Sequence, residues 1–229
     1  MENYPDKLTA GDYAHSAAKG LLGMVPFAGA VVTEIFSMVI TPPLEKRRRE
    51  WMESVAEKLK QLEENGGIKL NSLSENEGFI DVVLQATSIA IKTSERRKLE
   101  SLRNAVVNST TVDSEEIIKR HIFLNQLDKF TTWHIVILEF ADNPRRWFEK
   151  NNVTPPSLMA GSLFTLVKTA FPYLESREEL VNIIWEDLRV AGFHSSGSIK
   201  STMTEAGLYA ERTSQLGREF LTFISSNEG

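Results

Sequence analysis

The sequence predicts a mostly α-helical protein, with a helical bundle over residues 1–128 followed by a winged-helix-like module over residues 129–229 that has at most a small two-stranded hairpin. Apolar residues recur at helical spacing along most of the 229 residues, and no useful length alternates with the period of two that is typical of strands. Capping residues and Gly or Pro terminators separate these segments. A content of 41% hydrophobic and 25% charged residues is that of a globular protein.

Proline and glycine divide the first part of the chain. Residues 12–22 form a short Ala-rich segment, and a second helix is expected over residues 27–40, ending at "TPP". Pro42 or Pro43 then occupies the first turn of a third helix, where a missing amide donor costs little. The third helix ends at "NGG", and its apolar stripe consists of Leu44, Trp51, Val55, Leu59 and Leu62.

Three further helices complete the predicted bundle. The Ser-x-x-Glu spacing of Ser74 and Glu77 predicts a capping box before the first of them. The second begins at Thr93 or Ser94, and the third covers residues 113–130. The residues expected to face inward are Phe79, Ile80, Val83, Leu84, Thr87 and Ile91 on the first helix and Leu99, Leu102 and Val106 on the second.

Residues 129–229 indicate three helices, a short hairpin and a closing helix, which is the order of a winged-helix module. The third helix is expected over Ser176–Val190, capped by Ser176 and closed by Gly192. We expect a two-stranded wing near Phe193–Glu211 and a final helix capped at Thr213 or Ser214. The three helices lie in "FTTWHIVILEFADNP", "TPPSLMAGSLFTLVKTAF" and "SREELVNIIWEDLRVAGF".

The apolar segment Gly20–Ile40 leaves two interpretations open. As a continuous helix, residues 21–40 measure about 30 Å, which is just enough to span a bilayer. A mostly apolar helix with one polar stripe is typical instead of the central helix of a soluble bundle, and this is the interpretation we prefer. On a helical wheel the polar stripe contains Ala30, Thr33, Glu34, Ser37 and Thr41, and the opposite side contains Phe27, Val31, Ile35 and Met38.

The basic run "EKRRRE" after this segment keeps the membrane alternative open. Positive charge beside an apolar segment is what inside-positive topology and anionic headgroups favour. Glu45, Glu50 and Glu53 can instead pair with the arginines at helical spacing on a solvated face. The candidate membrane or partner contacts are Phe27, Glu34, Lys46, Arg47, Arg48 and Arg49.

No pattern in the sequence indicates catalysis, a cofactor or a metal. The absence of cysteine removes thiol chemistry and makes a reducing cytoplasm the simplest location, and the N-terminus lacks the pattern of a secretory signal. The four histidines have no metal-ligand spacing, and His134 begins an apolar helix where packing is its expected role. Neither a phosphate-binding glycine loop nor a Gly-x-Ser-x-Gly elbow occurs. We therefore expect a protein that is not an enzyme and uses no cofactor.

Charge disfavours nucleic acid as a partner. The net charge is -5, and the candidate recognition helix carries Arg177 and Arg189 against five acidic residues between Glu175 and Asp187. DNA binding would therefore need the wing, through Lys200 or Arg212.

Several segments together resemble a widespread set of bacterial proteins of unassigned function, over nearly the whole chain. They contain a Pro-x-x-Gly helix, a basic amphipathic helix and a closing Leu-Gly-x-x-Phe helix. The closing pattern and the helical layout are also similar to the Abi-alpha group of abortive-infection proteins, which implies a role in defence against phage and transfers no catalytic residue. The segments are "MVPFAGAVVTEIFSMVITPPLEKRRREWMESVAEKLKQLEE", "FIDVVLQATSIAIKTSERRKLESLRNAVVNS", "TTWHIVILEFADNP" and "TSQLGREFLTFI".

These observations predict a non-enzymatic helical interaction protein of the bacterial cytoplasm, acting in phage defence or a stress response. Its expected partner is another protein or a second copy of the chain in a homo-oligomer. Two alternatives stay open: an effector that inserts Gly20–Ile40 into a membrane on activation, and a winged-helix regulator that binds DNA. Trp51 and Phe220 are expected to be buried.

Overall fold

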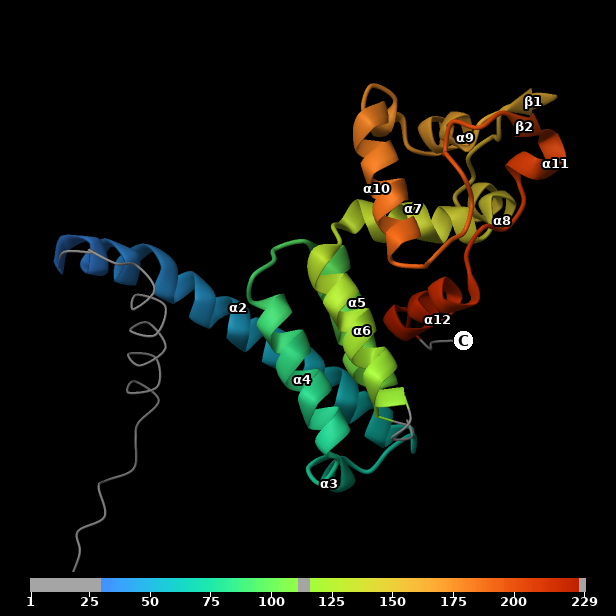
Figure 1. The fold of residues 1–229 in the computed structure, drawn as a ribbon. Helices are drawn as coiled ribbons and strands as arrows, with labels where there is room; N and C mark the ends of the chain where they lie inside the picture. The colour runs from blue at the N-terminus through green and yellow to red at the C-terminus, as the bar shows by residue number, and fades with distance from the viewer. Residues whose placement is uncertain (1–29, 111–115, 227–229) are drawn as a thin grey trace, which may run out of the picture.

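The computed structural model of the protein describes residues 30–110 and 116–226, with the backbone alone for residues 30–41. In these ranges the protein is mostly α-helical, as predicted, and contains one sheet of two short antiparallel strands. Figure 1 shows a long first helix that joins a helical bundle, beside a second group of helices that carries the strands. The predicted segment at residues 12–22 lies outside the described residues.

The bundle contains α2 to α6. These are α2 (Ala30–Glu64), α3 (Leu70–Leu73), α4 (Glu77–Ala90), α5 (Arg96–Asn108) and α6 (Ile117–Lys129). The remaining elements are α7 (Thr132–Asp142), α8 (Pro144–Lys150), β1 (Ala160–Gly161), α9 (Leu163–Ala170), the 3-10 helix η2 (Pro172–Leu174), α10 (Glu178–Val190), β2 (Met203–Thr204), α11 (Glu205–Leu208) and α12 (Gln215–Ile224).

α2 is one helix where the sequence predicts two. It passes through Pro42 and Pro43, so the expected break at "TPP" is wrong. Each proline removes one amide donor, but its fixed φ near -65° is already helical, so the backbone continues without two hydrogen bonds. At 1.5 Å per residue, the 35 residues of α2 make a rod of about 52 Å.

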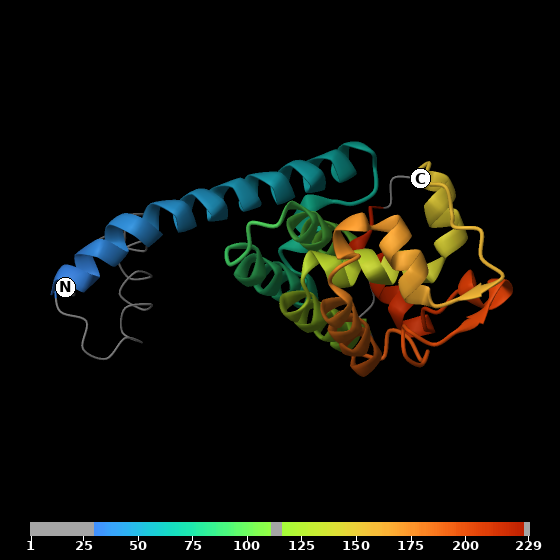
Figure 2. The same cartoon turned by 90° about the horizontal axis from the view of Figure 1, so that it is seen from above.

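Only the C-terminal part of α2 packs against the bundle. Trp51 and Val55 are buried, and α2 contacts α3, α4 and α5. Residues 42–50 are exposed apart from the half-buried Leu44. In both views the N-terminal half of α2 extends away from the other described helices (Figure 1, Figure 2). Residues 30–40 therefore do not form the central helix of the bundle that the sequence suggests.

The bundle core comes from α4, α5 and α6. α4 packs against both other helices, and its fully buried Ala86 permits a close approach. The inward positions predicted on α5, Leu102 and Val106, are confirmed, whereas Leu84 on α4 is 64% exposed. The stripe that α4 buries is Phe79, Val82, Ala86, Ile89 and Ala90.

The two strands do not form the expected hairpin. β2 lies in the region predicted for the wing, but its partner β1 precedes α9: Ala160 pairs with Thr204, and Gly161 pairs with Met203. The segment before β2 forms one isolated antiparallel bridge, between His194 and Thr213, and its buried Ile199 accepts a backbone hydrogen bond from Phe164 N of α9 at 3.0 Å. A two-stranded wing confined to residues 193–211 is therefore wrong.

Two helices begin at other residues than the sequence predicts. Asn76 caps α4 in place of Ser74, since its side chain accepts from Phe79 N at 3.0 Å. α10 begins after Arg177, so the predicted Ser176 cap is wrong. Its predicted end is confirmed by the positive φ of 78° at Gly192.

α12, the last helix of the second part of the molecule, packs against α5 of the bundle. Asn104 Nδ2 on α5 donates to the Ile224 carbonyl of α12 at 3.0 Å. Phe220 is fully buried, as predicted, and the cap of α12 is Ser214. One hydrophobic core runs through both parts, and the division at residue 128 stays a prediction.

Candidate functional site

The basic run at residues 46–49 lies on the exposed part of α2, next to the point where this helix joins the bundle. Lys46 Nζ is 3.8 Å from Glu50 Oε1. Arg48 and Arg49 are exposed, and neither forms an ion pair with another described residue. The expected pairing of these arginines with glutamates is therefore wrong within the described part, and both guanidinium groups face solvent.

Arg47 differs from the other cations of this run because it faces a cavity. Its Nη1 donates a long hydrogen bond of 3.5 Å to the Ile91 carbonyl, at the end of α4. The cavity measures about 360 Å³ and lies between α2 and α5. Arg47 and Trp51 of α2 face Arg96, Leu99 and Arg103 of α5 across it.

The structure does not describe the side chains of the two other predicted contacts, Phe27 and Glu34. Phe27 lies outside the described residues. Glu34 lies in the projecting half of α2, where the backbone alone is described. Among the described helices, none is long and apolar enough to cross a membrane.

The predicted wing contacts, Lys200 and Arg212, are engaged in internal interactions. Lys200 forms an ion pair with Glu178 at the start of α10. Arg212 Nη1 donates to the carbonyls of Leu208 at 3.2 Å and Ala210 at 2.6 Å, and burial lowers the pKa of this guanidinium. These two side chains hold α10 and α11 in place, and they do not form a cationic surface.

The exposed face of α10 is apolar and acidic. Leu180, Ile183 and Val190 are 40%, 57% and 74% exposed on this helix. Its one basic side chain, Arg189, forms an ion pair with Glu186. A helix with this surface repels the phosphates of DNA.

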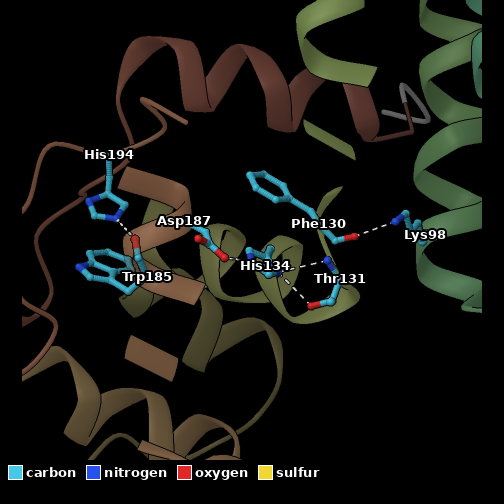
Figure 3. Close-up of polar contacts among 7 residues, drawn as sticks. All are labelled: Lys98, Phe130, Thr131, His134, Trp185, Asp187 and His194. Carbon is cyan, nitrogen blue, oxygen red and sulfur yellow. Dashed lines mark hydrogen bonds and ion pairs between the residues drawn. The ribbon is translucent and has the colours of Figure 1, made fainter. Parts of the chain in front are cut away.

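A buried histidine connects α7 to α10 (Figure 3). His134 Nδ1 lies 3.1 Å from Thr131 N and 2.9 Å from Thr131 Oγ1, and its Nε2 lies 3.2 Å from Asp187 Oδ2. The Thr131 N–H can only donate, so Nδ1 is the acceptor and Nε2 carries the proton given to Asp187. Burial lowers the pKa of His134 and so favours the neutral ring, against the opposing effect of Asp187. The hydrogen-bonded series Thr131–His134–Asp187 therefore contains the capping box at the start of α7. This geometry agrees with the packing role expected for His134.

Three cations of α5 that no sequence pattern singled out contribute to the bundle. Lys98 is buried and donates to the carbonyl of Phe130 (Figure 3) and to that of Asp128, both at 2.8 Å. Arg96 and Arg103 both line the cavity at the base of α2. Their spacing of seven residues places them on one face of a helix and could have indicated a cationic stripe.

The described residues contain no group of three or more His, Asp or Glu side chains that could hold a metal ion. The fold and site define a mostly α-helical protein with a projecting helix and an arginine-lined cavity at its base. No protein-family model, curated protein or solved structure matches the chain.

Proposed function

We propose that the protein is a non-enzymatic helical interaction protein whose α2 binds the α2 helix of a second copy. The observation that supports this proposal is the projection of α2. Among the side chains that the structure describes, Trp51 is the first buried one along α2, and residues 30–50 continue the helix for about 30 Å on its N-terminal side.

A projecting helix of this composition needs a partner. Most helical stability in proteins comes from tertiary packing of an apolar face, and intrinsic helix propensity contributes less. The sequence places Val31, Ile35 and Met38 on one stripe. Burying such side chains contributes about 1.5–3 kcal/mol each. A second copy offers an identical stripe, so a two-fold pairing buries both.

Light scattering after size-exclusion chromatography tests the proposal. The full chain should show a mass above 25.8 kDa that increases with concentration. Ile35→Glu should reduce this mass toward that of the single chain, because it places a charge in the apolar stripe. Ser37→Glu adds the same charge to the opposite stripe and should leave association intact. A mass of one chain at every concentration, or equal losses in the two variants, contradicts the proposal.

The membrane effector and the DNA-binding regulator, which are the two alternatives, predict different results for the same purified protein. Flotation of the monomeric chain with anionic vesicles, without self-association, would favour the membrane effector. A winged-helix regulator would bind DNA with a strong salt dependence, although the acidic surface of α10 opposes this function.

The biological setting that we propose is defence against phage or a stress response. It is supported by the resemblance to the Abi-alpha group alone. Loss of protection against phage in cells that produce Ile35→Glu, with protection retained for Ser37→Glu, would connect self-association to this setting.

A further inference from the structure

We propose that the cavity between α2 and α5 binds a small phosphate ester. Arg47 and Trp51 lie one turn apart on α2, and Arg96 and Arg103 lie two turns apart on α5, so the two pairs line the cavity from opposite sides. The volume of about 360 Å³ falls within the range of small-molecule sites, roughly 300–1,000 Å³. This proposal is independent of the self-association of α2.

The charge of the cavity lining favours an anion. Glu50 and Glu100 also line it, so two carboxylates oppose three guanidinium groups. Lys46 lies 3.8 Å from Glu50 on the exposed side and balances one of these carboxylates. Arg96 and Arg103 form no ion pair within the described residues. In a chain with a net charge of -5, this local excess of positive charge selects an anionic ligand.

Arg103 supplies a donor that lacks an acceptor. Its Nε is buried, and no described residue accepts a hydrogen bond from it. A buried N–H without an acceptor is costly, so a ligand oxygen at this position is favoured. A guanidinium presents five donors in a planar fork that matches the oxygens of a phosphate. Two further guanidinium groups, from Arg47 and Arg96, line the same space.

The apolar part of the lining favours an ester over inorganic phosphate. Trp51, Ala90 and Leu99 form this part. Trp51 Nε1 donates to Thr87 Oγ1 at 2.9 Å, so the indole ring is held in one orientation. An organic group attached to the phosphate would contact these side chains. This chemistry is common to soluble phosphate metabolites and to lipid headgroups.

Binding of two probes to the full chain tests the site and identifies the source of the ester. Glycerol phosphate is titrated by calorimetry, and flotation is measured with phosphatidylcholine vesicles that contain or lack phosphatidic acid. Arg96→Gln and Arg103→Gln should each weaken binding about tenfold or more, because each removes a charge-assisted pair. Arg48→Gln removes the same charge from an exposed position outside the cavity and should change affinity by less than about twofold.

Each outcome has one meaning. Binding of glycerol phosphate that depends on Arg96, without flotation on vesicles that contain phosphatidic acid, supports a site for a soluble ester. Flotation that needs phosphatidic acid and depends on Arg96 supports a headgroup site. Absence of binding to both probes overturns the proposal, as does an equal loss in Arg48→Gln, because the attraction would then be diffuse. Arg96 is exposed, so its variant keeps the test valid if Arg103→Gln melts early.

Discussion

Replacement of Gly217 by alanine should destabilise the protein, because α12 approaches the chain more closely at this residue than a side chain allows. A Cβ at Gly217 would lie 2.4 Å from the Phe193 carbonyl oxygen and 2.6 Å from Thr213 Cγ2. Ordinary van der Waals contact begins at 3.4 Å, so the carbonyl oxygen would have to move by about 1 Å. That carbonyl is held in place, since it accepts a hydrogen bond of 2.8 Å from Ser214 N.

Three contributions set the magnitude for Gly217→Ala. Overpacking in a closed core costs about 1–3 kcal/mol. Weakening the Ser214 hydrogen bond costs about 1 kcal/mol. The higher helix propensity of alanine relative to glycine stabilises the folded state by about 1 kcal/mol. The free energy of unfolding should therefore fall by about 2 kcal/mol, which lowers the Tm of a chain of this size by about 4–8 °C.

Thermal melts followed by far-UV circular dichroism measure this effect. Gly197→Ala is the matched control, because the nearest atom to its new Cβ is Ser201 Oγ at 4.0 Å. It should change stability by less than about 0.5 kcal/mol. If Gly217→Ala melts at or above the wild-type temperature, α12 is not seated against Phe193 as described.

Two other expectations concern the core and pH. Trp51→Ala and Phe220→Ala should each lower the free energy of unfolding by about 3–5 kcal/mol in urea titrations, since both rings are buried; near-native melting of either would contradict their placement. Burial lowers the pKa of both His134 and His194 below the ordinary 6.5, so the folded state binds these protons less readily than the unfolded state. The stability contributed by keeping these two histidines neutral should be fully present above pH 6.5 and should be lost as the pH decreases below 6.5. The carboxyl groups with a lowered pKa lose their contribution only near and below pH 4.5. His194→Gln should weaken the pH dependence just below 6.5 in urea titrations, and a protein that gains stability on acidification in that range would refute this reasoning.

The helices could be predicted because their signals are local. The spacing of Leu102 and Val106, the serine before α12 and the glycine after α10 each act within one or two helical turns. The path of α2 through Pro42 and Pro43 could not be predicted in this way. Two adjacent prolines favour a helix start, because a proline in a helix interior removes a hydrogen bond and its ring crowds the preceding turn. The continuous path of α2 through both prolines is an exception that this local rule does not predict.

The sheet and the cavity depend on long-range contacts that periodicity does not encode. β2 lies in the expected region, but its partner β1 lies before α9, and the segment between α10 and β2 is hydrogen-bonded to α9 through the Ile199 carbonyl. Arg96 and Arg103 share a helix face that the sequence does indicate. Their meeting with Arg47 depends on the packing of α2 against α5, which no local pattern specifies.

The contact between α5 and α12 has a consequence for synthesis of the chain. Asn104 and its partner Ile224 are separated by 120 residues, so α5 leaves the ribosome well before the helix that covers it. At about 5–20 residues per second, the delay is roughly 6–24 s. During this interval the side of α5 that α12 later covers remains uncovered, and a nascent chain in this state is a substrate for chaperones.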